Sequence, residues 1–425
     1  METDEVRDFM SLSPSAARTI MLVDMNAYFA SVEQQCNPAL RGKPVAVCGE
    51  GRTVIVTASY EARAFGVKTG MTLPEARQIC PGLIPVQGDL DKYIETSLRI
   101  HKILLDYTDM VEVFSIDECF MDVTATHRLF GGAVNIAREI KDRIKKEFGL
   151  LCSVGIGPNR VVSKIAGKMH KPDGLTVMNK EDIYGIFKNM PVEKLQGVGI
   201  GPRVAEKLYF IGIKTAAELG GAPVQLLKSH FGILGRIYKA IGMGLDDTPV
   251  AKYGDEKPVK SVGHSHTLAA DTTDINVIYS YLLMLCEKTG FRLRGYKLTA
   301  RTAAVYVRFS DFTGFSQRKT FKHYFDSGEE IFKCAKEIFD SLLPLQKEVR
   351  LLGISVGNLS AAAGQSFLFE NDEKKRQLTC AVDEINKKHG DFTVKPALLI
   401  TAEKFGILER CGIISTRIWN KQRRS

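Results

Sequence analysis

Two hydrophobic periods alternate along the first 190 residues. Short apolar runs such as 19–23 and 151–156 predict buried strands, and the segments that follow them have the spacing of amphipathic helices. From residue 191 the pattern becomes helical, and residues 262–358 predict strand, helix, two strands, helix and strand. A chain of 425 residues is too long for one core, so we expect an α+β protein of several domains.

Composition narrows this picture only slightly. The net charge of +9 suits a nucleic-acid partner without requiring one. Nine scattered cysteines, with no Cys-x-x-Cys pair and no zinc spacing, predict reduced thiols in the cytoplasm. No segment approaches the roughly 20 apolar residues that cross a bilayer, so no membrane partner is expected. Residues 1–18 are acidic and lack an apolar run, which favours a flexible leader over a signal peptide.

Two adjacent carboxylates stand between two β-prone runs. Asp117 and Glu118 lie at the expected turn, where neighbouring like charges are unfavourable unless cations neutralise them. Asp24 ends the strand expected at 19–23. If these strands are neighbours in one sheet, three carboxylates converge and favour a divalent metal site. Taken singly, each acid has a structural alternative, as a helix N-cap or as a solvated turn residue.

Two further features indicate nucleic acid. The segment 195–208 carries Gly197, Gly199 and Gly201 and is typical of a helix-hairpin-helix, whose turn presents backbone N–H groups to a phosphate. A plain tight connection is the alternative, whereas a Rossmann fingerprint would need a preceding strand and a following acid. Between residues 288 and 322, nine Lys and Arg residues accompany one acid, Asp311, which predicts a phosphate-tracking surface or a solvated face.

Four motifs occur in order, at 23–33, 58–63, 115–118 and 168–174. Together they resemble the Y-family DNA polymerases, nearest to the bacterial DNA polymerase IV and ImpB/MucB/UmuC-like branch, over about residues 19 to 360. The resemblance implies a right-hand polymerase. Its parts would be a leader (1–18), palm (19–35 and 88–185), fingers (36–87), thumb (186–253), linker (254–261), little finger (262–358) and tail (359–425).

The resemblance also implies roles for individual residues. Asp24, Asp117 and Glu118, with the backbone carbonyl of Met25, would hold two Mg²⁺ ions for nucleotidyl transfer from a dNTP to a primer 3′-hydroxyl. The family commonly has an acid where this chain has Asn26, a departure that leaves these ligands intact. Nucleotide contacts would come from Thr57, Tyr60, Arg63 and Lys171, and a steric gate against the ribose 2′-hydroxyl from Phe29. Expected DNA contacts are Gly197, Gly199, Gly201, Arg292, Arg294, Arg301, Arg308, Arg318 and Lys319.

The last motif concerns a protein partner. Residues 365–369 resemble the Gln-x-x-Leu-Phe peptide by which bacterial polymerases hold the sliding clamp, which makes Gln365, Leu368 and Phe369 the expected contacts. Packing of these residues on their own domain is the alternative. Residues 377–388 could form an amphipathic helix, on the same chain or on a partner.

These patterns and the resemblance lead to one functional expectation. The chain is expected to be a monomeric, template-directed, Mg²⁺-dependent polymerase for error-prone translesion synthesis, in the bacterial cytoplasm and at the nucleoid during repair. The alternatives are a non-catalytic DNA-binding accessory with a polymerase-like palm, and a nucleotidyl cyclase-like palm enzyme.

Overall fold

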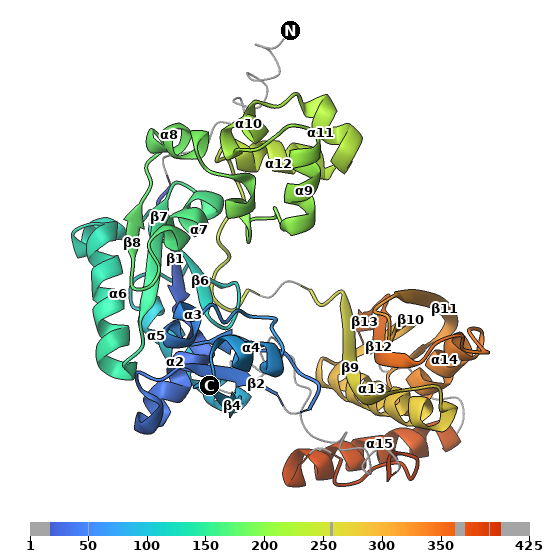
Figure 1. The fold of residues 1–425 in the computed structure, drawn as a ribbon. Helices are drawn as coiled ribbons and strands as arrows, with labels where there is room; N and C mark the ends of the chain where they lie inside the picture. Colours follow the sequence, from blue (N-terminus) through green and yellow to red (C-terminus); the bar gives the residue numbers. More distant parts are fainter. Residues whose placement is uncertain (1–17, 50, 256–257, 362–369, 391, 401–425) are drawn as a thin grey trace. The chain divides into compact units, whose positions relative to one another are not determined.

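The computed structural model describes residues 18–49, 51–255, 258–361, 370–390 and 392–400 (Figure 1). The chain divides into two compact units, the first ending at Asp255 and the second beginning at Glu256. The division falls inside the segment 254–261 that the sequence favours as a linker. Both units mix helices with sheets, so the expected α+β multidomain class is confirmed.

The first unit is organised by a sheet that we call the central sheet. Its strands, in spatial order, are β5 (Val111–Val113), β6 (Glu118–Asp122), β1 (Ile20–Met25), β7 (Cys152–Gly157) and β8 (Leu175–Val177). Strand β1 is antiparallel to both of its neighbours, β6 and β7. The strands that carry Asp24 and Glu118 are therefore adjacent, which is the condition that the sequence analysis set for convergence.

Helices cover both faces of the central sheet. Side-chain alternation sends Met21 and Val23 into a core with α2 (Tyr28–Cys36), α5 (Leu90–Leu105) and α6 (Ala133–Phe148). On the opposite face lies α7 (Arg160–Met169), close against β7. A Cβ added at Gly155 would lie 2.1 Å from the carbonyl oxygen of Ser163, so this close packing of α7 requires glycine.

A small sheet lies between β1 and α5 in the sequence. Its order is β3 (Thr57–Ala58), β2 (Val45–Cys48) and β4 (Ile84–Gln87). Its compact core, which includes Ala46, Ile55 and Ala62, also takes in side chains of α3 (Tyr60–Ala64) and α4 (Leu73–Ile79). Helix α4 begins with a capping box between Thr72 and Glu75. Two short 3₁₀ helices also belong to the first unit, η1 (Pro38–Leu40) beside α2 and η2 (His127–Phe130) beside α6.

The helical part of the first unit follows β8. It contains α8 (Asp182–Lys188), η3 (Val192–Leu195), α9 (Pro202–Phe210), α10 (Ala216–Gly221), α11 (Val224–Phe231) and α12 (Leu234–Gly242). Their core includes Leu195, Leu208 and Leu227 and extends onto Val161 and Ile165 of α7. Helix α7 therefore belongs to two cores, with one side on the central sheet and another on the helical part.

The second unit has one antiparallel sheet with helices on one face. The strand order is β11 (Gly314–Phe325), β10 (Leu298–Phe309), β12 (Val349–Gly357) and β9 (Ser261–Thr272), and β13 (Ser360–Ala361) pairs with β10. Helices α13 (Ile275–Gly295) and α14 (Gly328–Asp340) bury residues such as Val305 and Val307 of β10. The elements occur in the predicted order of strand, helix, two strands, helix and strand.

The last helix covers the segment whose packing partner the sequence left open. Helix α15 (Glu370–His389) spans the predicted amphipathic segment. Asp383 of α15 pairs with Arg294 of α13, with two nitrogen–oxygen distances of 2.7 and 2.8 Å. Leu399, further along the chain, is fully buried in the core of the second unit. Asp383 thus bonds within its own chain, whereas Leu378 and Ile385 of the predicted apolar face are 65% and 40% exposed.

Candidate active site

The acidic residues gather at one end of the central sheet. Asp24 of β1 lies directly opposite Glu118 of β6 in the antiparallel register, and Asp24 is only 3% exposed. Asp117 precedes Glu118, and its backbone carbonyl accepts a hydrogen bond of 2.9 Å from the Met25 N–H. Its carboxylate accepts one of 2.5 Å from the Ser115 hydroxyl. Carboxylates directly opposite each other repel, so this end of the sheet needs compensating positive charge.

Two lysines supply part of that charge. Lys171 Nζ lies 2.5 Å from Asp24 Oδ1, and Lys164 Nζ of α7 lies 2.6 Å from Glu118 Oε2. Burial nevertheless raises the pKa of Asp24 to about 7, against the effect of Lys171 and with the help of Glu118. Burial also raises the pKa of Asp117. For Glu118, burial is outweighed by Lys164, and the pKa is lowered.

The donor set suits a hard divalent cation. Carboxylates and a backbone carbonyl at Met25 are the oxygen ligands that Mg²⁺ takes, and the raised pKa values of two acids indicate negative charge that a cation would stabilise. Within the described residues, no group of three or more His, Cys, Asp and Glu side chains is arranged around one point to hold an ion. The chemistry of these residues fits a divalent metal, and their coordination of two ions stays a prediction.

The residues expected at the nucleotide lie near this acidic end. Tyr60 and Arg63 are on α3, and the Arg63 guanidinium carbon lies 5.0 Å from the centre of the Tyr60 ring. Burial raises the pKa of Tyr60, the charge of Arg63 lowers it and the charge of Asp24 raises it. The effect of Asp24 indicates that Tyr60 lies close to the acids. Its hydroxyl is buried without a hydrogen-bond partner in the described part of the chain. Thr57 is the first residue of β3, the strand that precedes α3 in the sequence.

Phe29, the expected steric gate, is a rigidly packed residue of α2. Its ring stacks on Tyr93 with centroids 4.3 Å apart and planes 12° apart. The Tyr93 hydroxyl in turn donates a hydrogen bond of 2.6 Å to Glu33. This packing holds the ring in one place, as a gate requires, and is equally compatible with a core aromatic residue.

The sequence analysis did not assign site roles to Asn26 and Lys164. Asn26 Oδ1 accepts a hydrogen bond of 2.7 Å from the backbone N–H of Asp173, so Asn26 ties the end of β1 to the turn that carries Lys171. For Lys164, helical spacing from Lys168 was the one available signal, and its partner, Glu118, is 46 residues away in the sequence.

The predicted glycine hairpin has the expected backbone. Gly197 and Gly199 have φ angles of +95° and +113°, in the left-handed region that favours glycine, and α9 begins directly after Gly201. Lys168 Nζ of α7 donates a hydrogen bond of 2.7 Å to the carbonyl of Gln196, next to this turn. The hairpin and the acidic end of the sheet therefore share α7 as a support.

The basic run of the second unit is divided between two sides of its sheet. Arg308 and Arg318 alternate with the buried positions of β10 and β11, so they face away from the helices. Lys319 faces the helices and pairs with Glu337 of α14. Arg292 and Arg294 lie on α13, where Arg292 donates to the carbonyl of Gly263.

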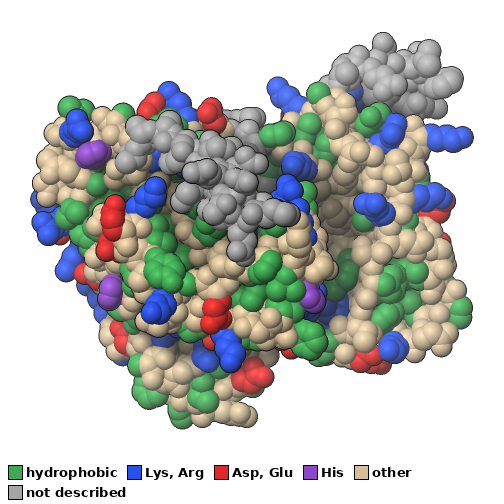
Figure 2. All heavy atoms as spheres, turned by 90° about the horizontal axis from the view of Figure 1, so that it is seen from above, with side chains coloured by type: hydrophobic (Ala, Val, Ile, Leu, Met, Phe, Trp, Pro, Cys, Tyr) green, Lys and Arg blue, Asp and Glu red, His purple; other side chains and the backbone are tan. Residues whose placement is uncertain are grey.

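Arg301 is the last of the six Lys and Arg residues expected to contact DNA. Arg301 lies on β10 with its guanidinium carbon 5.6 Å from the centre of the Tyr324 ring. Of the expected DNA contacts, Arg308 and Arg318 thus lie on the sheet face away from the helices, whereas Lys319, Arg292 and Arg294 bond to other residues of the second unit. On the face drawn in Figure 2, Lys and Arg side chains are spread among other residues rather than gathered in one patch.

Three further expectations concern the clamp-binding peptide, the leader and the membrane. The expected clamp contacts, Gln365, Leu368 and Phe369, lie outside the described residues. The same holds for most of the leader. Of the helices that are described, none is long and apolar enough to cross a membrane.

Comparison with known proteins gives consistent relatives. Residues 23–168 match the model of the impB/mucB/samB family, and residues 259–368 match that of the impB/mucB/samB family C-terminal domain. DNA polymerase IV of Moorella thermoacetica is 38% identical over 388 residues, which are 90% of this chain and 96% of the relative. DNA polymerase IV 1 of Bacillus subtilis is 36% identical over 402 residues, 92% of this chain and 95% of the relative.

The solved structures point the same way. A Y-family DNA polymerase chimera superposes with a TM-score of 0.72 at 29% identity. The match covers 80% of this chain and 98% of the chimera.

Proposed function

The chain belongs to the impB/mucB/samB family of Y-family DNA polymerases, and on this basis we propose how its own residues perform the reaction. It is a DNA-directed DNA polymerase of the translesion class, with a right-hand polymerase fold. The relatives do not favour the alternative of a non-catalytic accessory. Primer-template DNA and dNTP are its substrates.

The pairing of Asp24 with Glu118 carries the assignment of the catalytic site. It brings two carboxylates face to face, with Asp117 beside them and Lys171 and Lys164 against them. Asp24, Asp117, Glu118 and the Met25 carbonyl would hold two Mg²⁺ ions, in an enzyme class that depends on divalent metal. A pair of Mg²⁺ ions supplies activation of the 3′-hydroxyl and neutralisation of the triphosphate.

The other residues would position the nucleotide. Lys171 brings its ammonium group to the acidic end, and the Asn26 hydrogen bond holds the turn that carries it. Arg63 offers a planar guanidinium that can grip phosphate oxygens in a bidentate way. The Tyr60 hydroxyl, which lacks a partner in the described chain, would donate to a phosphate oxygen. Thr57 would also contact the nucleotide, and Phe29 would lie beneath its sugar.

A primer-extension assay with Asp117→Asn and Glu118→Gln tests this site. We expect each variant to lose more than about 100-fold in rate, beyond the effect typical of outer-shell residues. Asp122→Asn is the matched control, because Asp122 lies at the other end of β6 and accepts a hydrogen bond from the Thr124 N–H. Primer-template affinity, measured by anisotropy, should be equal in all variants. Extension at the parental rate by Asp117→Asn would refute the assignment.

DNA would be held by two separate parts of the chain. The hairpin at Gly197–Gly201 would present backbone N–H groups to a phosphate, and the open sheet face of the second unit carries Arg308 and Arg318. We accordingly assign the palm, fingers and thumb to the first unit and the little finger to the second. Contacts of DNA with Arg294 of α13 are disfavoured, because Arg294 pairs with Asp383.

A sliding clamp is the proposed protein partner. Gln365, Leu368 and Phe369 match the clamp-binding peptide, and the elements on either side, β13 and α15, both belong to the second unit. An apolar pair in a pocket gives modest affinity, which tethering on DNA amplifies through effective concentration. Replacing Leu368 and Phe369 with Ala should abolish clamp stimulation and spare clamp-free extension. Equal stimulation of parent and variant would refute the partner.

We further propose a monomer in the bacterial cytoplasm that associates with the nucleoid during repair. The bacterial origin of the relatives supports the compartment. Light scattering of the purified chain and imaging of a fluorescent fusion after DNA damage would test the two statements separately.

A further inference from the structure

We propose that Ser97 and His101 form a positioning pair that holds the backbone of the metal-binding turn, and thereby sets the affinity of the active site for Mg²⁺. The two residues lie one turn apart on α5 and are each 1% exposed. Neither belongs to a motif that the sequence analysis used. The inference rests on the proposed metal role of Asp117 and Glu118.

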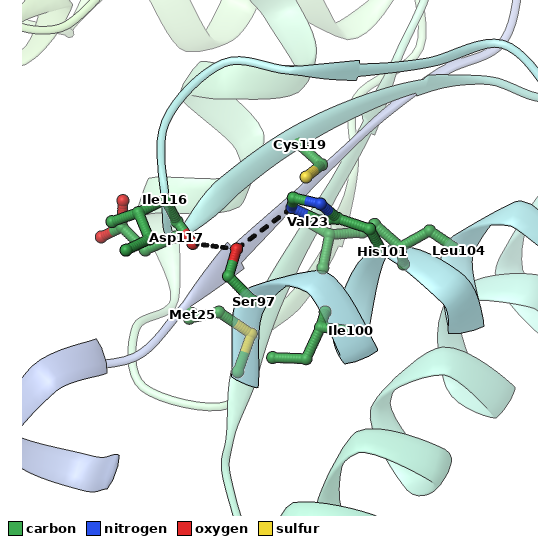
Figure 3. Close-up of a pocket in the computed structure, with 9 residues that line it drawn as sticks. All are labelled: Val23, Met25, Ser97, Ile100, His101, Leu104, Ile116, Asp117 and Cys119. Carbon is green, nitrogen blue, oxygen red and sulfur yellow. Dashed lines mark hydrogen bonds between the residues drawn. The ribbon is translucent and has the colours of Figure 1, made fainter. Parts of the chain in front are cut away.

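The pair reaches the turn through one backbone carbonyl. The Ser97 hydroxyl donates a hydrogen bond of 2.7 Å to the carbonyl of Ile116, the residue before Asp117. His101 Nε2 lies 3.2 Å from the same Ser97 oxygen. Figure 3 shows both contacts, with Ser97 between the imidazole ring and the turn. The line of contacts runs from α5 to the peptide group that carries Asp117.

The hydrogen-bond roles in this pair follow from the acceptor. A carbonyl oxygen can only accept, so the single Ser97 proton points at Ile116, and His101 must donate to Ser97 through its Nε2–H. Burial lowers the pKa of His101 to about 4, so the ring is neutral at physiological pH. A neutral ring with its proton on Nε2 orients the Ser97 hydroxyl toward the turn.

Ser97 differs from other buried helical hydroxyls in this protein. A Ser or Thr inside a helix commonly bonds the carbonyl of its own preceding turn. Ser280 and Thr289 of α13 do so, at 2.8 and 2.7 Å from the carbonyls of Asn276 and Leu285. Ser97 instead bonds a carbonyl 19 residues away in the sequence. Its hydrogen bond therefore serves the turn.

Hydrogen bonds act together with the packing of the buried Ile116 side chain to hold this turn. A cavity of about 10 Å³ lies behind it, lined by side chains that include Val23, Ile100 and Cys119 (Figure 3). Two successive carbonyls of the turn are held by hydrogen bonds, Ile116 from α5 and Asp117 from the Met25 N–H of β1. Removing the first bond would leave a buried carbonyl unpaired and take away one of these two attachments of the turn.

Ser97→Ala is compared with Thr108→Val to test the proposal. Thr108 is the matched control, since its buried hydroxyl donates a hydrogen bond of 2.9 Å to the carbonyl of Asp122, at the other end of the same strand β6. Both variants should lower the urea midpoint of the first unit by similar amounts. We expect Ser97→Ala to raise the Mg²⁺ concentration for half-maximal extension about tenfold, as outer-shell changes do, and Thr108→Val to leave it within about twofold.

Two measurements do not depend on activity. Binding of Mn²⁺ followed by electron paramagnetic resonance should weaken in Ser97→Ala by the same factor as the Mg²⁺ requirement. Amide hydrogen exchange of a peptide covering residues 113–121 should become faster in Ser97→Ala than in Thr108→Val. Equal metal affinity and equal exchange in the two variants would overturn the proposal.

A second pair of variants keeps the test independent of Ser97. Glutamine places an amide nitrogen where histidine has Nε2, so His101→Gln should keep the parental Mg²⁺ requirement, and His101→Leu should raise it. Equal Mg²⁺ requirements in these two variants would also overturn the pair. If Asp117→Asn retains extension, the metal site itself is wrong, an outcome separate from a failure of the Ser97 comparison.

Discussion

The central sheet and the sheet of the second unit, which we propose as the palm and the little finger, place their candidate functional residues differently. In the palm, α5 and α6 cover one face and α7 the other, and the acids lie at the end of the strands. In the little finger, α13 and α14 cover one face only, and Arg308 and Arg318 lie on the other. Chemistry requires a few buried groups held in place, whereas gripping DNA requires an accessible surface with dispersed charge.

The difference predicts different responses to substitution. A buried charge pair is costly to break because the remaining partner stays buried without compensation. An exposed phosphate contact contributes little by itself and adds to others. Single changes in the palm should therefore have large effects, and single changes on the open face of the little finger should have small ones.

The largest effect is expected from Lys164→Met. Lys164 and Glu118 have side chains only 5% and 15% exposed, so the change leaves the Glu118 carboxylate buried without its cation. We expect a loss of about 3 kcal/mol in the free energy of unfolding of the first unit, measured in urea. The double variant Lys164→Met with Glu118→Gln should recover part of this loss. No recovery would show that Lys164 acts through packing, for instance on the Phe114 ring 3.9 Å away.

The next effect concerns sugar selection in the palm. Phe29→Ala removes the ring that stacks on Tyr93 and should open space beneath the sugar without changing the acids. We expect discrimination between dNTP and rNTP, measured in single-turnover reactions, to fall by about 100-fold. Tyr107→Phe, which removes a buried hydroxyl bonded to Glu139, is a control and should keep parental discrimination. Unchanged selectivity in Phe29→Ala would show that the ring is only a core residue.

A pH effect should appear in the little finger. Burial, together with the charges of Arg292 and Lys288, lowers the pKa of His264 to about 3. His264 thus binds a proton less tightly in the folded state than in the unfolded chain. The stability of the folded second unit is therefore fully present above pH 6.5 and is lost as the pH falls toward 3. At pH 5 the loss is about 2 kcal/mol.

His264→Gln provides the check on this pH effect. Arg292 can only donate its hydrogen bond of 3.2 Å to His264 Nε2, and a Gln oxygen can accept it without titrating. Hydrogen exchange of β9 peptides at pH 7.5 and pH 5 should show a smaller acid loss in the variant. An equal acid loss in parent and variant would assign the pH dependence to other groups.

The smallest effect is expected on the open face of the little finger. Arg318→Gln should weaken primer-template binding by a few fold and lower the slope of log affinity against log salt by about 1. Lys319→Gln is the matched control, because Lys319 is the next residue and pairs with Glu337 on the helix side. Equal losses in the two variants would remove the distinction between the faces of this sheet.

Local pattern was enough to predict much of this protein. The strand that carries Asp24, the strand that begins at Glu118, the glycine hairpin and the element order of the second unit follow from periodicity and turn residues within short windows. The four ordered motifs also predicted the family to which the chain belongs. These features are local because backbone preferences and side-chain alternation act over a few residues.

Only the tertiary structure identified the partners of these residues. The contacts of Lys164 with Glu118, of Asn26 with Asp173 and of Ser97 with Ile116 join segments that are 46, 147 and 19 residues apart. The basic run looked one-sided in the sequence because charge was counted without regard to sheet face, and the structure divides it between Arg318 and Lys319. Which groups neutralise, hold or expose a residue depends on how distant segments pack, and no local pattern contains that information.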